Sequence, residues 1–196
     1  MNISDAIKGR RSIRRFLDKE IDKDIILKIL DAGILAPSPK NNQPWRFYIV
    51  TKETKEEMIN IIKNGIKEIR ASFGSLVSGD FLNSAEATLK TMEEAPVTIF
   101  VINVKNKMKF KHSPVSKFLE MANIQAIGAA IENMALASLE YGIGSLWIGD
   151  IFFNYSDISK WLCTDKQVVA AVSFGYPAET PHARPRKELD SIIEWR

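Results

Sequence analysis

Residues 119–141 read LEMANIQAIGAAIENMALASLEY and form the most unusual segment of the chain. Its apolar residues cover almost every face of a helix, and a helix that is apolar all round is buried all round. In a chain of 196 residues we therefore expect a central helix, or one packed against a second subunit. Gly128 and the alanines would allow close approach of another helix, and Gly142 is expected to end the helix as a left-handed cap.

The segments on either side predict a mixture of helices and strands. Apolar residues at helical spacing and candidate caps predict helices over about 23–35, 55–70, 82–94 and 157–162, after a short first helix. Ser4, Asp22 and Ser156 are the candidate N-caps. Runs rich in β-branched and aromatic residues predict strands over 45–51, 97–104, 145–148 and 167–174, and 189–195 also looks strand-like. We expect loops over 71–80 and 105–117. Because the order lacks strict βαβ alternation, we predict an α+β fold with a small sheet, in a single domain over 1–196.

Composition and charge argue against a disordered chain and a membrane-spanning chain, and they give no indication of a nucleic-acid-binding protein. The chain is 45% apolar and 26% charged, which excludes a disordered chain. The longest uncharged stretches, 95–104 and 121–131, are too short to span a membrane, and no apolar signal region fits in the charged first twenty residues. One cysteine, Cys163, allows no internal disulfide, so a cytoplasmic setting is expected. A net charge of +3 is too weak to indicate a nucleic-acid partner.

Several familiar catalytic motifs are absent. Two G-x-x-x-x-G stretches, 74–79 and 144–149, are each followed by aspartate where a phosphate-binding loop needs lysine. His112 and His182 stand apart without metal-ligand spacing, so we interpret both as exposed loop residues. Cys163 is interpreted as a quiet, buried or half-buried thiol rather than a nucleophile.

The positive signal is a pair of basic clusters. The first is GRRSIRRF at 9–16, where Arg10, Ser12 and Arg14 alternate and would share one face of an extended segment. Two guanidinium forks and a hydroxyl on that face would suit a phosphate. The second cluster is RPRK at 184–187. The alternative is two solvated basic turns.

A proline-rich loop is the third feature. Residues 37–44 read PSPKNNQP, and three prolines in eight residues exclude both helix and strand. The loop is either a structural connector or a rigid wall whose backbone groups face a flat ligand.

Five motifs in this order resemble those of the FMN-dependent nitroreductase family. They are RRSIRRF at 10–16, APSPKNNQPW at 36–45, GIGSLWIG at 142–149, FGYP at 174–177 and RPRK at 184–187. The resemblance implies a domain-entwined homodimer with a small, mainly antiparallel sheet flanked by helices. It also implies an FMN site at the interface, with the helix over 119–141 forming much of that interface and the C-terminal tail reaching the partner.

The resemblance assigns roles to individual residues. Arg10 and Ser12 would hold the FMN phosphate with Arg186 and Arg184, while Arg14 and Arg11 would lie near the pyrimidine edge of the flavin. The other subunit would line the flavin with Pro37, Ser38, Pro39 and Asn41. The backbone of Ile148 and Gly149 would approach the ring; many relatives have glutamate where this chain has Ile148. Residues 65–85 match none of the motifs.

The implied activity is transfer of reducing equivalents from NAD(P)H to a nitroaromatic, quinone or similar electron-poor acceptor by a ping-pong mechanism. Because the flavin carries the chemistry, no catalytic acid or base is nominated. Three alternatives remain open: a specialised reductase, dehalogenase or enone reductase on the same fold, a non-catalytic FMN-binding protein, and a nucleic-acid binder using the arginine clusters. The last would lose affinity steeply with salt.

Overall fold

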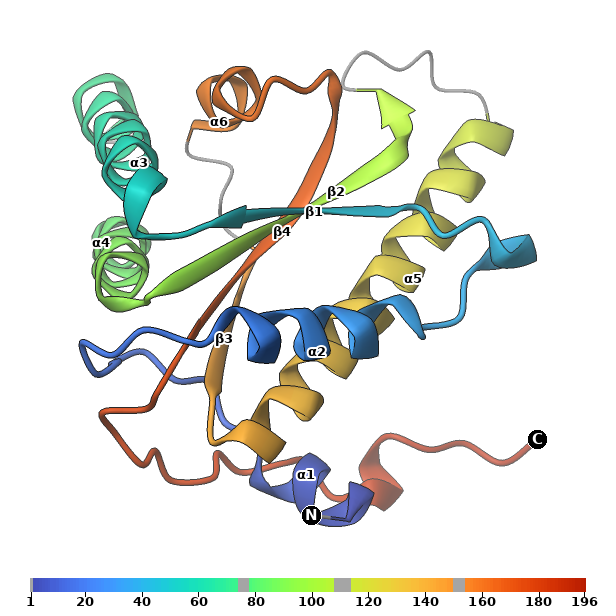
Figure 1. Cartoon of the computed structure of the whole chain (residues 1–196). Helices are drawn as coiled ribbons and strands as arrows, with labels where there is room; N and C mark the ends of the chain where they lie inside the picture. The colour runs from blue at the N-terminus through green and yellow to red at the C-terminus, as the bar shows by residue number, and fades with distance from the viewer. Residues whose placement is uncertain (1, 74–77, 108–113, 150–153) are drawn as a thin grey trace.

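A four-stranded antiparallel sheet forms the centre of the computed structural model, which describes residues 2–73, 78–107, 114–149 and 154–196 (Figure 1). Its strands are β1 (Trp45–Val50), β2 (Val97–Lys107), β3 (Gly144–Ile148) and β4 (Lys166–Gly175). They lie in the order β1-β2-β4-β3, and every neighbouring pair is antiparallel. The predicted α+β class with a small antiparallel sheet is confirmed.

Helices cover both faces of this sheet. The helices α2 (Lys23–Ile34) and α5 (Pro114–Ser138) pack on one face, while α3 (Lys52–Phe73), α4 (Gly79–Glu94) and α6 (Tyr155–Trp161) pack on the other (Figure 1). Alternation along β2 explains the two cores, because Ile99 and Val101 point to α2 and α5 whereas Phe100 and Ile102 point to the opposite helices.

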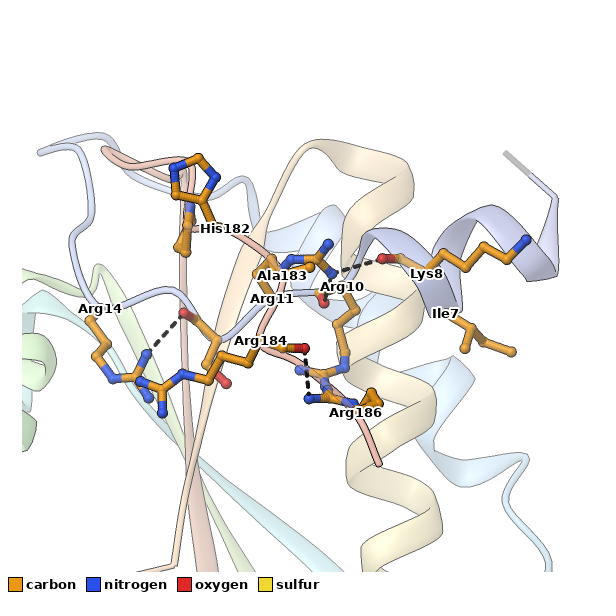
Figure 2. A pocket seen from close by; sticks show the side chains of 11 residues that line it. Ile7, Lys8, Arg10, Arg11, Arg14, His182, Ala183, Arg184 and Arg186 are labelled. Atoms are coloured by element: carbon orange, nitrogen blue, oxygen red, sulfur yellow. Dashed lines mark hydrogen bonds between the residues drawn. The ribbon is translucent and has the colours of Figure 1, made fainter. Parts of the chain in front are cut away.

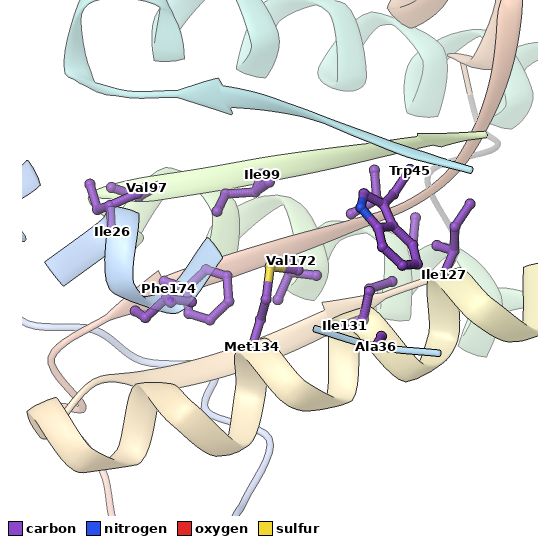
Figure 3. Close-up of a cluster of buried hydrophobic side chains, with 14 of the residues drawn as sticks. Ile26, Ala36, Trp45, Val97, Ile99, Ile127, Ile131, Met134, Val172 and Phe174 are labelled. Atoms are coloured by element: carbon purple, nitrogen blue, oxygen red, sulfur yellow. The ribbon is translucent and has the colours of Figure 1, made fainter. Parts of the chain in front are cut away.

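Helix α5 buries only one of its apolar faces within the chain. Ala126, Ile127, Ala130, Ile131 and Met134 pack against the sheet and α2, as Figure 3 shows for the labelled members. The apolar residues Val115, Phe118, Leu119 and Met121 are 49–68% exposed. The expectation of burial all round is therefore not met by a single chain, and the option of a central helix is excluded for this part of α5.

The close approach of two helices occurs at a glycine other than the expected one. A Cβ built on Gly33 of α2 would lie 2.7 Å from Cγ of Met134 on α5. Gly128 instead faces the ring of Trp147 on β3, with Cη2 at 3.4 Å from its built Cβ. Within one chain, α2 therefore approaches α5 through Gly33 rather than through Gly128, because the helical pattern does not show which face of α5 meets α2.

Two of the four predicted caps are confirmed. Asp22 accepts a hydrogen bond from the Asp24 N–H at the start of α2, and Gly142 has φ of +67° at the end of the 3-10 turn η2 (Leu139–Tyr141). The other two are wrong. Helix α1 (Ile3–Gly9) is capped by Asn2, whose Oδ1 accepts from the Asp5 N–H, so Ser4 lies within the first turn. Ser156 likewise lies inside α6, which follows Asn154.

The ends of several elements also differ from the expected ranges. Helices α3 and α4 and strand β2 are longer than predicted and α5 begins earlier, so 71–73, 79–80, 105–107 and 114–117 are helix or strand instead of the expected loops. Residues 74–77 and 108–113, including His112, lie outside the described residues. The predicted C-terminal strand is wrong: 189–191 form the 3-10 turn η4 (Leu189–Ser191), and 192–196 have no assigned structure. Among the described residues, this segment pairs with none of the four strands.

No helix among the described residues combines the length and the low polarity that crossing a membrane requires.

Candidate functional site

The two basic clusters, which are about 170 residues apart in sequence, border one cavity of about 490 Å³. Figure 2 shows their long side chains converging from two extended segments beside α1 and the C-terminal end of α5. The lining residues are Ile7, Lys8, Arg10, Arg11, Ser12, Arg14, Pro181, His182, Ala183, Arg184 and Arg186. Every residue of the basic set that we assigned to a phosphate or pyrimidine edge is among them.

Backbone pairing brings the clusters together. The Ile13 N–H donates to Ser145 O, and the Leu17 N–H donates to Tyr176 O, each at 2.9 Å. Ile13 and Phe16 are buried, with 6% of each side chain exposed, and they pack with Ala95. The first basic segment is therefore fixed along β3 and the end of β4, where the tail that carries Arg184 and Arg186 departs.

Neighbouring arginines of the first segment point in opposite directions. Arg14 lines the cavity, and its Nη1 donates to Ser12 O at 3.3 Å. The Nε of Arg15 instead lies 2.9 Å from both carboxylate oxygens of Glu94. The alternation of side chains along the extended segment would, by itself, also turn Arg11 away from the cavity. Arg11 reaches the lining because its Nη1 folds back to Lys8 O and Arg10 O, at 2.7 and 2.8 Å near the end of α1.

Positive charge dominates this cavity. Five arginines and Lys8 line it, whereas the described part of its lining contains no carboxylate. Arg10 has an ionic partner just outside, because its Nε lies 3.3 Å from Glu132 Oε1 on α5. A cavity walled by guanidinium groups favours an anion, and guanidinium forks pair with phosphate oxygens through two parallel hydrogen bonds. The arrangement suits a phosphate-bearing ligand.

The proline-rich loop holds an unusual backbone conformation. Lys40, Asn41 and Gln43 have φ of +51°, +53° and +43°, a region that costs non-glycine residues about 1–3 kcal/mol each when it is strained. Local hydrogen bonds fix it: the Gln43 N–H donates to Ser38 Oγ, and Asn42 Nδ2 donates to Oδ1 of the buried Asn123, each at 3.0 Å. These hydrogen bonds and the 3-10 turn η1 (Pro39–Asn41) hold the loop in one conformation, which fits both a structural connector and a wall that faces a ligand.

This loop lies away from the basic cavity. Pro37, Ser38 and Pro39 border a second hollow of about 280 Å³ against Ala122, Gln125, Ala126 and Ala129 of α5. The exposed Asn41 borders neither cavity, and the two linings share no residue. One chain thus brings Arg10, Arg11, Ser12, Arg14, Arg184 and Arg186 together but leaves Pro37, Ser38, Pro39 and Asn41 apart from them.

The end of β3 presents backbone rather than side chain. Ile148 is 2% exposed and packs into the core with α3, α4 and α6, while Gly149 is exposed and a Cβ built on it would meet nothing within 4 Å. Ser145 O points away from β4, since it accepts from Ile13. Backbone groups alternate along a strand, so those of Trp147 point to the same open edge. The sequence does not predict this orientation of the Trp147 backbone, because the strand register decides which N–H and C=O groups point to the neighbouring strand and which point away from it.

Other lining residues were also missed. Lys8 lies two positions before Arg10 and could have been grouped with the first cluster, whereas Ile7, Pro181 and Ala183 carry no signal in sequence. His182 lines the cavity, but its exposed ring points away from the guanidinium groups in Figure 2. Within the described ranges, no three His, Cys, Asp or Glu side chains gather as metal ligands would. The expected burial of Cys163 is wrong: the residue follows α6 and is exposed.

Solved and curated proteins resemble this chain over most of its length. A Methanothermobacter thermautotrophicus protein, provisionally named NADH dehydrogenase/NAD(P)H nitroreductase, is 28% identical over 98% of this chain and 86% of its own. A BluB-like flavoprotein from Clostridium difficile has a TM-score of 0.83 and 25% identity, covering 100% of this chain and 99% of its own. A candidate nitroreductase from Desulfovibrio desulfuricans, solved in complex with FMN, has a TM-score of 0.74 and 26% identity, covering 100% and 98%.

The sequence model of the Nitroreductase family matches residues 7–176. The match takes in the first basic segment, the proline-rich loop and all four strands, and it confirms the resemblance drawn from the motifs. The match ends before Arg184 and Arg186, which line the cavity from the tail. A match over this much of the fold establishes that the chain belongs to the Nitroreductase family.

Proposed function

We propose that this chain is an FMN-dependent oxidoreductase that passes reducing equivalents from NAD(P)H to nitroaromatics, quinones or similar electron-poor acceptors in a ping-pong cycle. The observation that carries the proposal is the cavity walled by five arginines from both ends of the chain. Family membership and the flavin-bearing neighbours support the choice of FMN over another phosphate ligand. When bound, FMN supplies the hydride-transfer chemistry.

The chain's own residues bind and orient this ligand. Arg10, Ser12, Arg184 and Arg186 would hold the phosphate through charge-assisted hydrogen bonds. Arg14 and Arg11 would lie toward the pyrimidine edge, where a fixed cation stabilises negative charge that develops on reduction. The open space beside Gly149 and the backbone of Ile148 and Trp147 would admit the ring system close to β3.

We also propose that the working unit is a homodimer. The sequence predicts that α5 is buried on all faces, yet one of its apolar faces is exposed in the single chain. Large exposed apolar patches mark interaction surfaces. The tail adds Leu189, Ile192 and Trp195, which are 60–91% exposed. A second copy that covers these surfaces would bring its own Pro37, Ser38, Pro39 and Asn41 to the first copy's basic cavity. The single-domain organisation and cytoplasmic location remain part of the proposal.

The test is a visible absorbance spectrum of the purified protein before and after anaerobic NADH or NADPH. We expect a flavin spectrum that bleaches with at least one nicotinamide. Steady-state rates with both substrates varied should then give parallel double-reciprocal lines. A protein that takes up no FMN would overturn the assignment. One that binds FMN but is reduced by neither nicotinamide would be a non-catalytic flavin protein.

A further inference from the structure

We propose that Glu179 is a positioning residue of the FMN site, which clamps the two basic segments together and aims Arg14 into the cavity. The inference rests on the proposed FMN site and adds a residue that is neither basic nor part of the cavity lining. Glu179 lies in the segment between the end of β4 and Pro181, where the lining begins again.

One carboxylate oxygen makes both of the contacts that carry this proposal. Oε1 of Glu179 accepts hydrogen bonds from the N–H groups of Arg14 at 2.5 Å and Arg15 at 3.2 Å, across 164–165 residues of sequence. The adjacent Ala178 N–H donates to Arg15 O at 2.9 Å. Residues 178–179 therefore bond to the N–H groups of Arg14 and Arg15 and to the carbonyl of Arg15, and these contacts fix the register of the two segments.

Arg14 is held through its backbone rather than through its guanidinium. Its N–H bonds Glu179, and its carbonyl accepts from the Thr91 Oγ of α4 at 3.1 Å. The side chain is exposed, with Ser12 O at 3.3 Å from Nη1. A long, exposed side chain keeps much rotamer freedom, so the region that its guanidinium can reach depends on the position and direction of its Cα–Cβ bond. Fixing that backbone lowers the entropy lost when a ligand binds.

The charge of Glu179 works against an anionic ligand in the neighbouring cavity. A carboxylate beside the site repels phosphate, so its contribution to binding must come from the hydrogen bonds it accepts. A glutamine oxygen can accept the same two N–H groups without the charge. Glu179→Gln therefore keeps the clamp and removes the repulsion, whereas Glu179→Ala removes both.

The experiment measures FMN dissociation constants by flavin fluorescence for the wild type, Glu179→Ala, Glu179→Gln and Glu56→Ala. Glu56 is an exposed α3 residue outside the cavity lining and serves as the control. We expect Glu179→Ala to bind FMN roughly tenfold more weakly, from the loss of two hydrogen bonds to a charged acceptor. The FMN dissociation constant of Glu179→Gln should equal or fall below that of the wild type, with about threefold taken as the margin of agreement. The constant of Glu56→Ala should be unchanged. Thermal unfolding of each apo protein is measured in parallel.

Two results would overturn the inference while leaving the proposed function intact. In one, Glu179→Ala binds FMN as the wild type does. In the other, Glu179→Gln is as weak as Glu179→Ala while it unfolds at the wild-type temperature. If Glu179→Ala does not fold, the glutamine variant alone decides, because its binding must then match the wild type. A wild type that binds no FMN would overturn both the proposed function and the clamp.

Discussion

At the scale of single residues, Arg14 and Arg15 show how one position along an extended segment changes what an arginine does. Arg14 lines the cavity and Arg15 pairs with Glu94, so only Arg14 is available to a ligand. We expect Arg14→Ala to weaken FMN binding roughly tenfold or more, as lost charge-assisted contacts do. Arg15→Ala should change it little, since a half-exposed ion pair contributes at most about 1 kcal/mol to stability. Flavin fluorescence titration measures the FMN affinity of both variants. Equal losses of affinity would refute the claim that Arg14 faces the cavity and Arg15 faces away from it.

Glu94 gives the same segment a dependence on pH. Burial alone would raise the pKa of its carboxyl, but the hydrogen bonds from Arg15 and from the Phe16 N–H outweigh burial and lower it. A carboxyl whose pKa is lower in the folded state stabilises the fold above its unfolded pKa, and this contribution is lost as pH falls through the folded value. The window is therefore below the ordinary glutamate pKa of about 4.3.

The expected result is that Glu94→Gln flattens the loss of apo-protein stability with acid in that window. Glu93→Gln is the matched control, because Glu93 is the neighbouring exposed glutamate on α4. Urea midpoints between pH 5 and the lowest pH at which the protein stays folded measure the slope. A Glu94→Gln slope identical to those of wild type and Glu93→Gln would show that the pair does not respond to acid.

At the scale of elements, glycines decide where segments meet. A Cβ on Gly175, at the end of β4, would lie 2.6 Å from a ring carbon of Phe16 and 2.8 Å from Cδ of Pro96. The aromatic ring of Phe16 and the pyrrolidine ring of Pro96 are rigid, so neither can avoid the added methyl group by a small side-chain rotation. Overpacking of this kind costs about 1–3 kcal/mol, and we expect that loss in the free energy of unfolding of Gly175→Ala.

Gly79→Ala is the control for this substitution. Gly79 begins α4 and has nothing within 4 Å of its built Cβ, so alanine there should be neutral or stabilise by about 0.4–1 kcal/mol. Denaturant midpoints at unchanged slope compare the two. Similar midpoints for both variants would mean that the N-terminal segment does not pack on β4 as described.

Elements were predictable from sequence where local chemistry decides them. The Asp22 cap, the Gly142 cap and the core strands follow from side chains within a few residues. The caps predicted at Ser4 and Ser156 each lie two residues beyond the true N-cap, Asn2 or Asn154, because residue type alone does not show where the first helical hydrogen bond forms. The wrong strand over 189–195 had suitable residue types, but a strand also needs a partner edge, which is a tertiary property.

At the scale of the whole molecule, the sequence predicted the cavity's five arginines, but it missed Lys8 and did not show what holds the arginines in place. Alternation pointed to Arg10, Ser12 and Arg14, because it is a local geometric rule. Glu179 lies 165 residues from Arg14, and no local pattern links the two. The same limit applies to the two halves of the proposed site. The loop over 37–44 and the basic segment border different cavities of one chain, and the proposed homodimer would join them.

A mixed dimer tests that assembly. Suppose one chain carries Arg10→Ala with Arg14→Ala, and the other carries Pro37→Trp, which fills the space beside the exposed loop. Each variant alone should bind FMN poorly, since both of its sites would be damaged. If each site takes its arginines from one chain and its loop from the other, a mixed dimer has one doubly damaged site and one intact site.

We therefore expect differently tagged chains, co-expressed and purified through both tags, to bind one FMN per dimer with wild-type affinity. If the arginines and the loop of a site came from the same chain, every site in the mixed dimer would carry one defect and no tight binding would return. The stoichiometry of tight sites thus distinguishes a shared site from two separate ones, independently of which acceptor the enzyme reduces. Co-expression of two wild-type chains with the same tags, which should bind two FMN, sets the scale.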